Sequence, residues 1–191
     1  MPDLIALPGG NLGNTSAFGK ALIEISGAGL IDKIPQMVTV QAAGSAPFSA
    51  YWERGWEEYE PVQAETIATA IKIGNPASVA RAKRAIDFTH GFVPNVTDEE
   101  IMEAKAVIDR VGIGCEPASA ATVAGVRKLR QQGMLSPDAT AIGILTGHVL
   151  KDGDATVKYH LEGANPLANK PVSIPGTMAD LERVLSDALH G

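Results

Sequence analysis

The sequence contains little cysteine, few aromatic side chains and no long apolar run. Its 191 residues include a single cysteine, Cys115, and Phe, Trp and Tyr together make up only 5% of the chain. One cysteine excludes an internal disulfide and a zinc site built from Cys-x-x-Cys pairs. No stretch approaches about 18 consecutive apolar residues, so we expect no membrane-spanning helix. The N-terminal residues also lack the basic segment and long apolar core of a signal peptide.

Basic residues are too few to suggest a nucleic-acid partner. The chain has 16 Lys and Arg against 22 Asp and Glu, a formal net charge of −6, whereas phosphate backbones are bound by clustered basic side chains. The apolar share of 45% and charged share of 20% are those of a globular protein. The histidines lack the spacing of metal ligands. We therefore expect a cytoplasmic protein that binds no nucleic acid, membrane or metal.

Short apolar runs alternate with helical patterns along the chain. Buried strands are predicted for apolar runs bounded by turn residues, at 4–7, 37–40 and 141–145. Helices are predicted over residues 15–26, 47–59, 77–87, 97–111, 117–132 and 177–189. Thr97 and Glu100 form a capping box at one helix start, and Trp52 and Trp56 are spaced to share one face of another. The alternation predicts an α/β fold of three layers, an open and mostly parallel twisted sheet with helices on both faces.

Two of the predicted strand ends are the expected location of a ligand. Ligands of open parallel sheets bind beyond the carboxyl ends of the strands. The strands that end near Leu7 and Leu145 are each followed by a loop that contains glycine. We therefore expect a functional site at these two ends.

The loop after the first strand has the composition of an anion-binding turn. It consists of Gly10, Asn11, Leu12, Gly13 and Asn14. Glycines there let the backbone approach an anion, which successive N–H groups and the helix start would hold. The loop carries no Lys or Arg, and it matches neither the Walker pattern nor GxGxxG. From the residues alone, a phosphate site and a simple strand–helix turn that needs glycine are equally supported.

Four segments carry a resemblance to a known family. They read LPGGNLGN, AIKIGNPAS, GCEPASAA and LTGHVLKD, at residues 7–14, 70–78, 114–121 and 145–152. In this order and spacing the sequence resembles threonine synthases, pyridoxal-phosphate enzymes with the fold of the tryptophan synthase β chain. The first and third segments are shared across that fold type, including threonine and serine dehydratases. The second and fourth resemble threonine synthases in particular.

The resemblance implies pyridoxal 5'-phosphate as the cofactor and assigns residues to it. The loop from Gly10 to Asn14 would grip the coenzyme phosphate. Thr146 would lie beside the pyridine nitrogen, where a hydroxyl can donate a hydrogen bond to a neutral ring. Glu116 begins a helix, so a coenzyme-side role and simple helix capping both remain open. Cys115, next to it, is expected to be buried and unreactive.

The resemblance also implies a reaction, the conversion of O-phospho-L-homoserine and water to L-threonine and phosphate. In the family the Schiff-base lysine stands in a Ser/Thr-Phe-Lys-Asp segment before the phosphate loop, and this sequence contains no such segment. We therefore expect residues 1–191 to form a single partial domain, the C-terminal part of the large coenzyme-binding domain, inactive alone. We further expect the first strand to lack a sheet neighbour, and the intact enzyme to be a homo-oligomer, a dimer.

Three other interpretations remain open. The first is another enzyme of the same fold type, such as a threonine or serine dehydratase. The second is a non-catalytic anion-binding half of a split enzyme, which an intact phosphate loop without the lysine segment suggests. The third is a Rossmann-type nucleotide binder, which is disfavoured because no ribose-binding acid stands about 20 residues after the loop.

Overall fold

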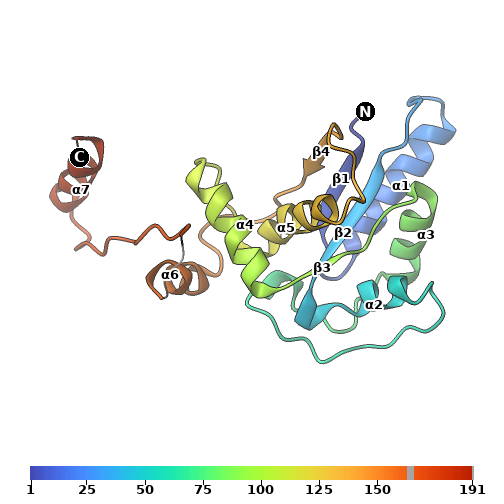
Figure 1. Ribbon diagram of the computed structural model, residues 1–191, viewed down its shortest axis with the longest axis horizontal. Helices are drawn as coiled ribbons and strands as arrows, with labels where there is room; N and C mark the ends of the chain where they lie inside the picture. The colour runs from blue at the N-terminus through green and yellow to red at the C-terminus, as the bar shows by residue number, and fades with distance from the viewer. Residues whose placement is uncertain (163–165, 191) are drawn as a thin grey trace.

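A four-stranded parallel sheet forms the centre of the computed structural model, which describes residues 1–162 and 166–190 (Figure 1). The strands are β1 (Leu4–Pro8), β2 (Gln36–Ala42), β3 (Asn95–Val96) and β4 (Ala141–Gly143). They lie in the order β3-β2-β1-β4, and each neighbouring pair is parallel. The chain therefore moves outward from β1 through β2 to β3, and then returns to the other side of β1.

Helices cover both faces of this sheet. In chain order the helices of the described residues are α1 (Gly13–Gly27), α2 (Pro47–Glu53), α3 (Val79–Thr89), α4 (Asp98–Arg110), α5 (Pro117–Gln131), α6 (Gly153–Leu161) and α7 (Met178–His190). Successive residues of a strand point to opposite faces. Ala6 accordingly belongs to an apolar cluster with α4 and α5, whereas Leu7 belongs to a second cluster with α1 and α3. The expected α/β architecture of three layers is confirmed.

The first strand lies inside the sheet, so the expectation that it lacks a neighbour is wrong. Leu4 is in register with Gln36 of β2 on one side and with Ala141 of β4 on the other. Asp3 extends the second contact, because its Oδ2 accepts a hydrogen bond of 2.7 Å from the Thr140 backbone N–H. Strand β4 pairs with the side of β1 that faces away from β2. The sequence did not indicate this pairing.

Strand β4 differs from the buried strand predicted over residues 141–145. It ends at Gly143, and all three of its residues are exposed. Ile142 keeps 46% of its surface accessible, because β4 forms the edge of the sheet. Only Ile144 and Leu145, which follow the strand, pack partly against the apolar clusters.

The helix predicted over residues 47–59 is shorter than expected. It ends at Glu53, because Gly55 and Trp56 both adopt left-handed backbone angles, with φ of 67° and 66°. The two tryptophans therefore do not share a helix face. Trp56 instead packs edge-on against Tyr51, with ring centroids 5.0 Å apart.

The capping box at residue 97 is confirmed. Thr97 Oγ1 accepts from the Glu100 backbone N–H at 3.1 Å, and the Glu100 carboxylate accepts from the Thr97 N–H at 2.7 Å. Strand β3 and helix α6 had no sequence prediction.

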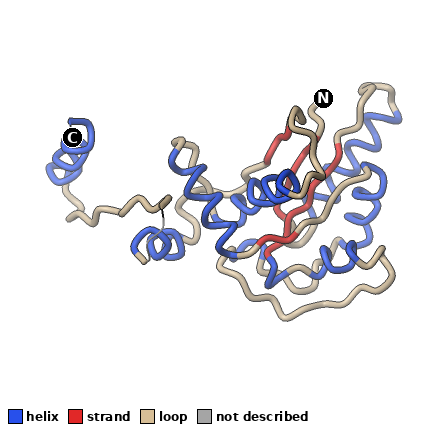
Figure 2. The backbone as a smooth tube through the Cα atoms, viewed as in Figure 1, coloured by secondary structure: helices blue, strands red, loops and turns tan. Residues whose placement is uncertain are grey.

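The last two helices extend away from the sheet. Figure 2 shows α6 and α7 lying apart from the sheet, and neither helix has a buried residue. Within residues 1–162 and 166–190, no helix is long and apolar enough to cross a membrane.

Candidate functional site

A cavity of about 220 Å³ opens where β1 and β4 end. These strands are neighbours in the sheet, and the chain leaves them toward opposite sides. This is the switch point at which open α/β sheets bind ligands. The cavity is lined by Pro8, Gly10, Asn11, Leu12, Gly13, Asn14, Ala70, Ile71, Glu116, Ala118 and Thr146. All seven residues that the sequence assigned to the coenzyme therefore lie together.

The glycine loop presents the start of α1 to the cavity. Leu12 precedes the helix in a left-handed conformation, with φ of 61°, and no side chain caps the helix. Its first turn also contains no acidic residue. The first backbone N–H groups of a helix lack partners within it, and its dipole favours an anion there. This end of α1 is therefore suited to a phosphate.

Two glycines of the loop have different surroundings: Gly10 is closely packed, and Gly13 faces open space. A Cβ on Gly10 would lie 2.7 Å from the backbone oxygen of Ala70, so the loop can approach that wall only with glycine. A Cβ on Gly13 would have no protein atom within 4 Å. A side chain at position 13 would therefore extend into solvent or into a ligand.

Asn11 holds the loop to the segment before α3. Its Oδ1 accepts a hydrogen bond of 2.7 Å from the Ala77 backbone N–H. In the next turn, the Thr15 and Thr39 hydroxyls share a buried hydrogen bond of 3.0 Å. These contacts fix the loop and the start of α1 against β2.

Glu116 lies at the start of α5, with its carboxylate in the cavity wall. The residue is only 2% exposed, and its side chain makes no capping bond, so the capping alternative is not what the structure shows. Its Oε1 accepts from the Ser119 hydroxyl at 3.4 Å. Lys151 Nζ lies 3.4 Å from Oε2 without hydrogen-bond geometry.

Thr146 brings the chain after β4 to the same wall. Its hydroxyl and that of Ser119 lie 3.3 Å apart and share a hydrogen bond. The next residue, Gly147, donates its backbone N–H to Ser119 Oγ at 2.9 Å. The hydroxyl of Thr146 is thus held beside the start of α5, at the edge of the cavity.

Cys115 is buried, as predicted. Burial raises the pKa of its thiol to about 11. Since the thiolate is the reactive form, this side chain is inert near neutral pH. It is also not among the residues that line the cavity.

Four further lining residues had no sequence prediction. Pro8, Ala70, Ile71 and Ala118 stand inside segments that carry the resemblance, and this was the only signal for them. They contribute backbone and small apolar surface, which leaves no chemical signature in a sequence. In the described part of the chain, no lysine lines this cavity.

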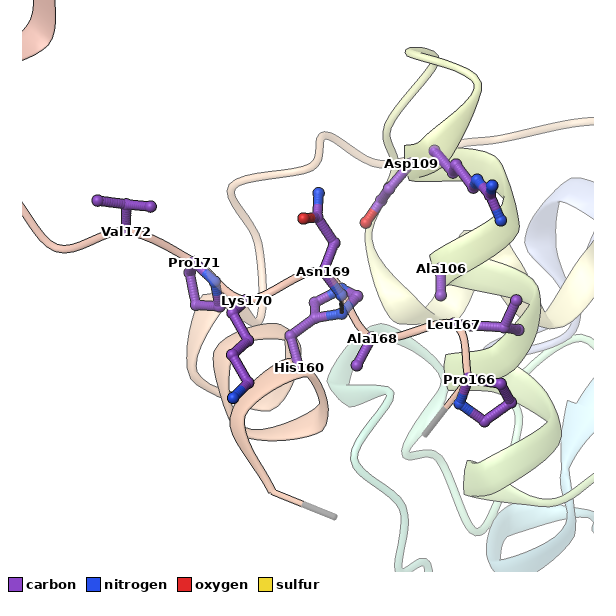
Figure 3. A pocket seen from close by; sticks show the side chains of 11 residues that line it. Ala106, Asp109, His160, Pro166, Leu167, Ala168, Asn169, Lys170, Pro171 and Val172 are labelled. Atoms are coloured by element: carbon purple, nitrogen blue, oxygen red, sulfur yellow. Dashed lines mark hydrogen bonds between the residues drawn. The ribbon is translucent and has the colours of Figure 1, made fainter. Parts of the chain in front are cut away.

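A second hollow lies elsewhere, beside α4. It encloses about 810 Å³ between that helix and residues 166–172, and Asp109, His160 and Asn169 line it (Figure 3). It contains none of the predicted site residues and no helix start. We therefore place the candidate site in the smaller cavity, where unpaired backbone donors converge. Among the described residues, no group of three His, Cys, Asp or Glu could hold a metal.

Comparisons with known proteins show which sequences and structures this chain is similar to. The threonine synthase of Methanocaldococcus jannaschii is 39% identical over 189 residues, which cover 98% of this chain and 45% of the relative. That of Methanosarcina acetivorans is 44% identical over 159 residues, 82% of this chain and 39% of the relative. The crystal structure of threonine synthase from Escherichia coli matches with a TM-score of 0.63 at 16% identity, over 97% of this chain and 44% of that one.

The family of this chain follows from a family model that matches most of its residues. The chain spans less than half the length of these relatives. The structural likeness, at low identity, supports the fold. A family model described as pyridoxal-phosphate dependent enzyme matches residues 1–147. Because that match covers most of the sequence, the chain belongs to the family of pyridoxal-phosphate dependent enzymes.

Proposed function

We propose that this chain forms the coenzyme-binding part of a threonine synthase. The observation that carries the proposal is the convergence of all seven predicted residues on one cavity. The identity of 39% to 44% with threonine synthases over most of the chain supports the choice within the family.

The cavity residues fit a phosphorylated pyridine. The uncapped start of α1 would hold the phosphate through the backbone N–H groups of Gly13 and Asn14. The Thr146 hydroxyl would turn from Ser119 to donate to the ring nitrogen. The buried Glu116 carboxylate, whose Oε2 has no hydrogen bond, would face a polar group of the coenzyme.

The proposed reaction converts O-phospho-L-homoserine and water into L-threonine and phosphate. When bound, the coenzyme supplies the electron-withdrawing ring that such exchanges at the β and γ carbons require. In this chain the α1 loop would bind and orient it, and the Thr146 hydroxyl would donate a hydrogen bond to the neutral ring nitrogen. The catalytic lysine would come from a segment outside this chain. Turnover by the chain alone is therefore not expected. The dimeric state of the intact enzyme and the cytoplasmic location stay predictions.

Coenzyme titration of two glycine variants tests the site. Gly13→Ala adds a methyl group that meets no protein atom but would enter the space of the phosphate. We expect its affinity for pyridoxal phosphate, measured by absorbance, to fall about tenfold or more, with an unchanged melting temperature. Gly27→Ala is the control, because it changes the other end of α1 and also meets no protein atom.

Two results of these titrations would contradict the proposal. If Gly13→Ala and Gly27→Ala bind the coenzyme as tightly as the parent chain, the phosphate does not lie at the start of α1. If the parent chain itself does not bind pyridoxal phosphate, the proposed function of this chain fails.

Substrate choice is tested by supplying the missing part. The N-terminal part of a threonine synthase relative would be co-expressed with this chain. We expect phosphate release from O-phospho-L-homoserine. Release of ammonia from free threonine instead would favour the dehydratase alternative.

A further inference from the structure

Part of the chain between β4 and α6 runs beside the cavity, and we call this part the strap. The strap, residues 146–152, has no helix or strand, and it belongs to the segment that resembles threonine synthases in particular. The proposed function uses only Thr146 from this segment. The contacts of the remaining residues show how the strap is held.

One attachment joins the strap to the start of α5. The Glu116 backbone N–H donates to the Gly147 oxygen at 3.1 Å, and the Gly147 N–H donates to Ser119 Oγ at 2.9 Å. A Cβ on Gly147 would lie 1.9 Å from Glu116 Oε1. The strap backbone is therefore pressed against a carboxylate of the cavity wall.

A second attachment is made by Lys151. Its Nζ lies 3.4 Å from Glu116 Oε2. A local turn directs it there, because the His148 oxygen accepts from the Lys151 backbone N–H at 3.1 Å. The carboxylate is buried and the ammonium is largely exposed, so Lys151 offsets part of the cost of burying that charge.

A third attachment reaches another part of the cavity wall. The Asp152 carboxylate accepts from the Thr69 backbone N–H at 3.2 Å and from its hydroxyl at 2.8 Å. Thr69 begins the short 3-10 helix Thr69–Ile71, whose last two residues line the cavity. Asp152 itself has a φ of 53°, a left-handed conformation that Asp tolerates better than most residues.

We propose that Lys151 and Asp152 are positioning residues that latch the strap across two walls of the cavity and so hold Thr146 at the coenzyme ring. A segment without helix or strand has little order of its own, and three attachments at its two ends restrict it. The role toward the coenzyme rests on the proposed function. The latch itself is a property of the chain without ligand.

Amide hydrogen exchange at Gly147 tests the latch in the ligand-free protein. Asp152→Gly removes both acceptors and still permits the left-handed backbone. We expect it to accelerate exchange at Gly147 about fivefold or more, since that N–H donates to Ser119. Asp154→Gly, an exposed change in the first turn of α6, is the matched control and should leave the rate unchanged.

Lys151 is tested in the same way with a conservative rescue. Lys151→Met should accelerate exchange at Gly147, and Lys151→Arg should restore the parent rate, because it keeps the charge beside Glu116. Lys158→Met removes an exposed ion pair with Glu162 at the end of α6 and is the control. Pyridoxal phosphate affinity should weaken several-fold in Asp152→Gly and Lys151→Met and keep the parent value in Lys158→Met.

The outcomes separate the latch from the proposed function. Unchanged exchange at Gly147 in Asp152→Gly, or equal acceleration in Asp154→Gly, overturns the latch. If Asp152→Gly accelerates exchange at Gly147 and the parent chain fails to bind pyridoxal phosphate, the latch is supported and the proposed function is refuted. Accelerated exchange with unchanged coenzyme affinity overturns the positioning role.

Discussion

At the scale of single residues, Lys105 places a charged group in the interior of the fold. Its side chain is fully buried in α4, 2.7 Å from Asp109 Oδ2, and its Nζ donates to the Cys115 backbone oxygen at 2.7 Å. It thereby ties α4 to the residue just before the cavity wall. Nothing in the amphipathic pattern of this helix indicated a buried lysine.

Removal of this lysine should destabilise the protein strongly. Lys105→Met leaves the Asp109 carboxylate without its partner, and Asp109 Oδ1 already lacks a hydrogen bond. We expect a loss of about 3 kcal/mol in the free energy of unfolding, measured by denaturant titration. Lys20→Met, which removes an exposed pair with Glu24, should change it by less than about 1 kcal/mol. Equal effects of the two substitutions would contradict this account of Lys105.

Because the Cys115 thiol is buried, we expect the free energy of unfolding to fall at alkaline pH. Burial raises the pKa of its thiol from near 9 to about 11, so between these values the unfolded chain releases a proton that the folded chain keeps. The stabilising contribution is complete below pH 9 and is lost as pH rises toward 11. Between pH 8 and pH 11 the parent chain should lose more unfolding free energy than Cys115→Ala. Parallel pH profiles of the two proteins would show that the thiol is not shielded.

At the scale of elements, helices and strands with a local residue pattern could be predicted from the sequence. Features that depend on tertiary packing could not. The strand, glycine loop and helix from Leu4 to Gly27 could be predicted because each step has its own residue pattern. Helix α6 could not, because its start has no side-chain cap and its sequence mixes Gly, Asp, Thr and Val. The exposure of β4 could not be predicted either, since an apolar run in a sequence does not indicate whether the strand lies at the edge of a sheet.

The capping box of α4 should contribute measurably to stability. Thr97→Ala removes the acceptor of the Glu100 N–H, and α4 packs into the core. We expect a loss of about 1 kcal/mol, measured as a lower denaturation midpoint. Thr177→Ala removes the corresponding acceptor of the Asp180 N–H at α7, which has no buried residue. That control should leave the midpoint unchanged, and a comparable shift would mean that α7 is coupled to the core.

At the scale of the whole molecule, the site is assembled from segments far apart in sequence. The glycine loop was recognisable by its local pattern, whereas Glu116 and Thr146 were assigned by resemblance alone. The wall at Ala70 could not be predicted, because it acts through a backbone oxygen that approaches Gly10. The same holds for the clamp between Thr69 and Asp152, which are 83 residues apart. The contact between Thr69 and Asp152 depends on the return of β4 to β1.

The most direct test of the account is to locate the coenzyme on this chain by NMR. Backbone amide spectra of the labelled protein would be recorded during titration with pyridoxal phosphate. We predict the largest shifts at residues 10–14 and at Thr146, which line the cavity, and at the adjacent Gly147. Shifts centred instead on residues 166–172, around the larger hollow beside α4, or no shifts at all, would contradict the assignment of the coenzyme site.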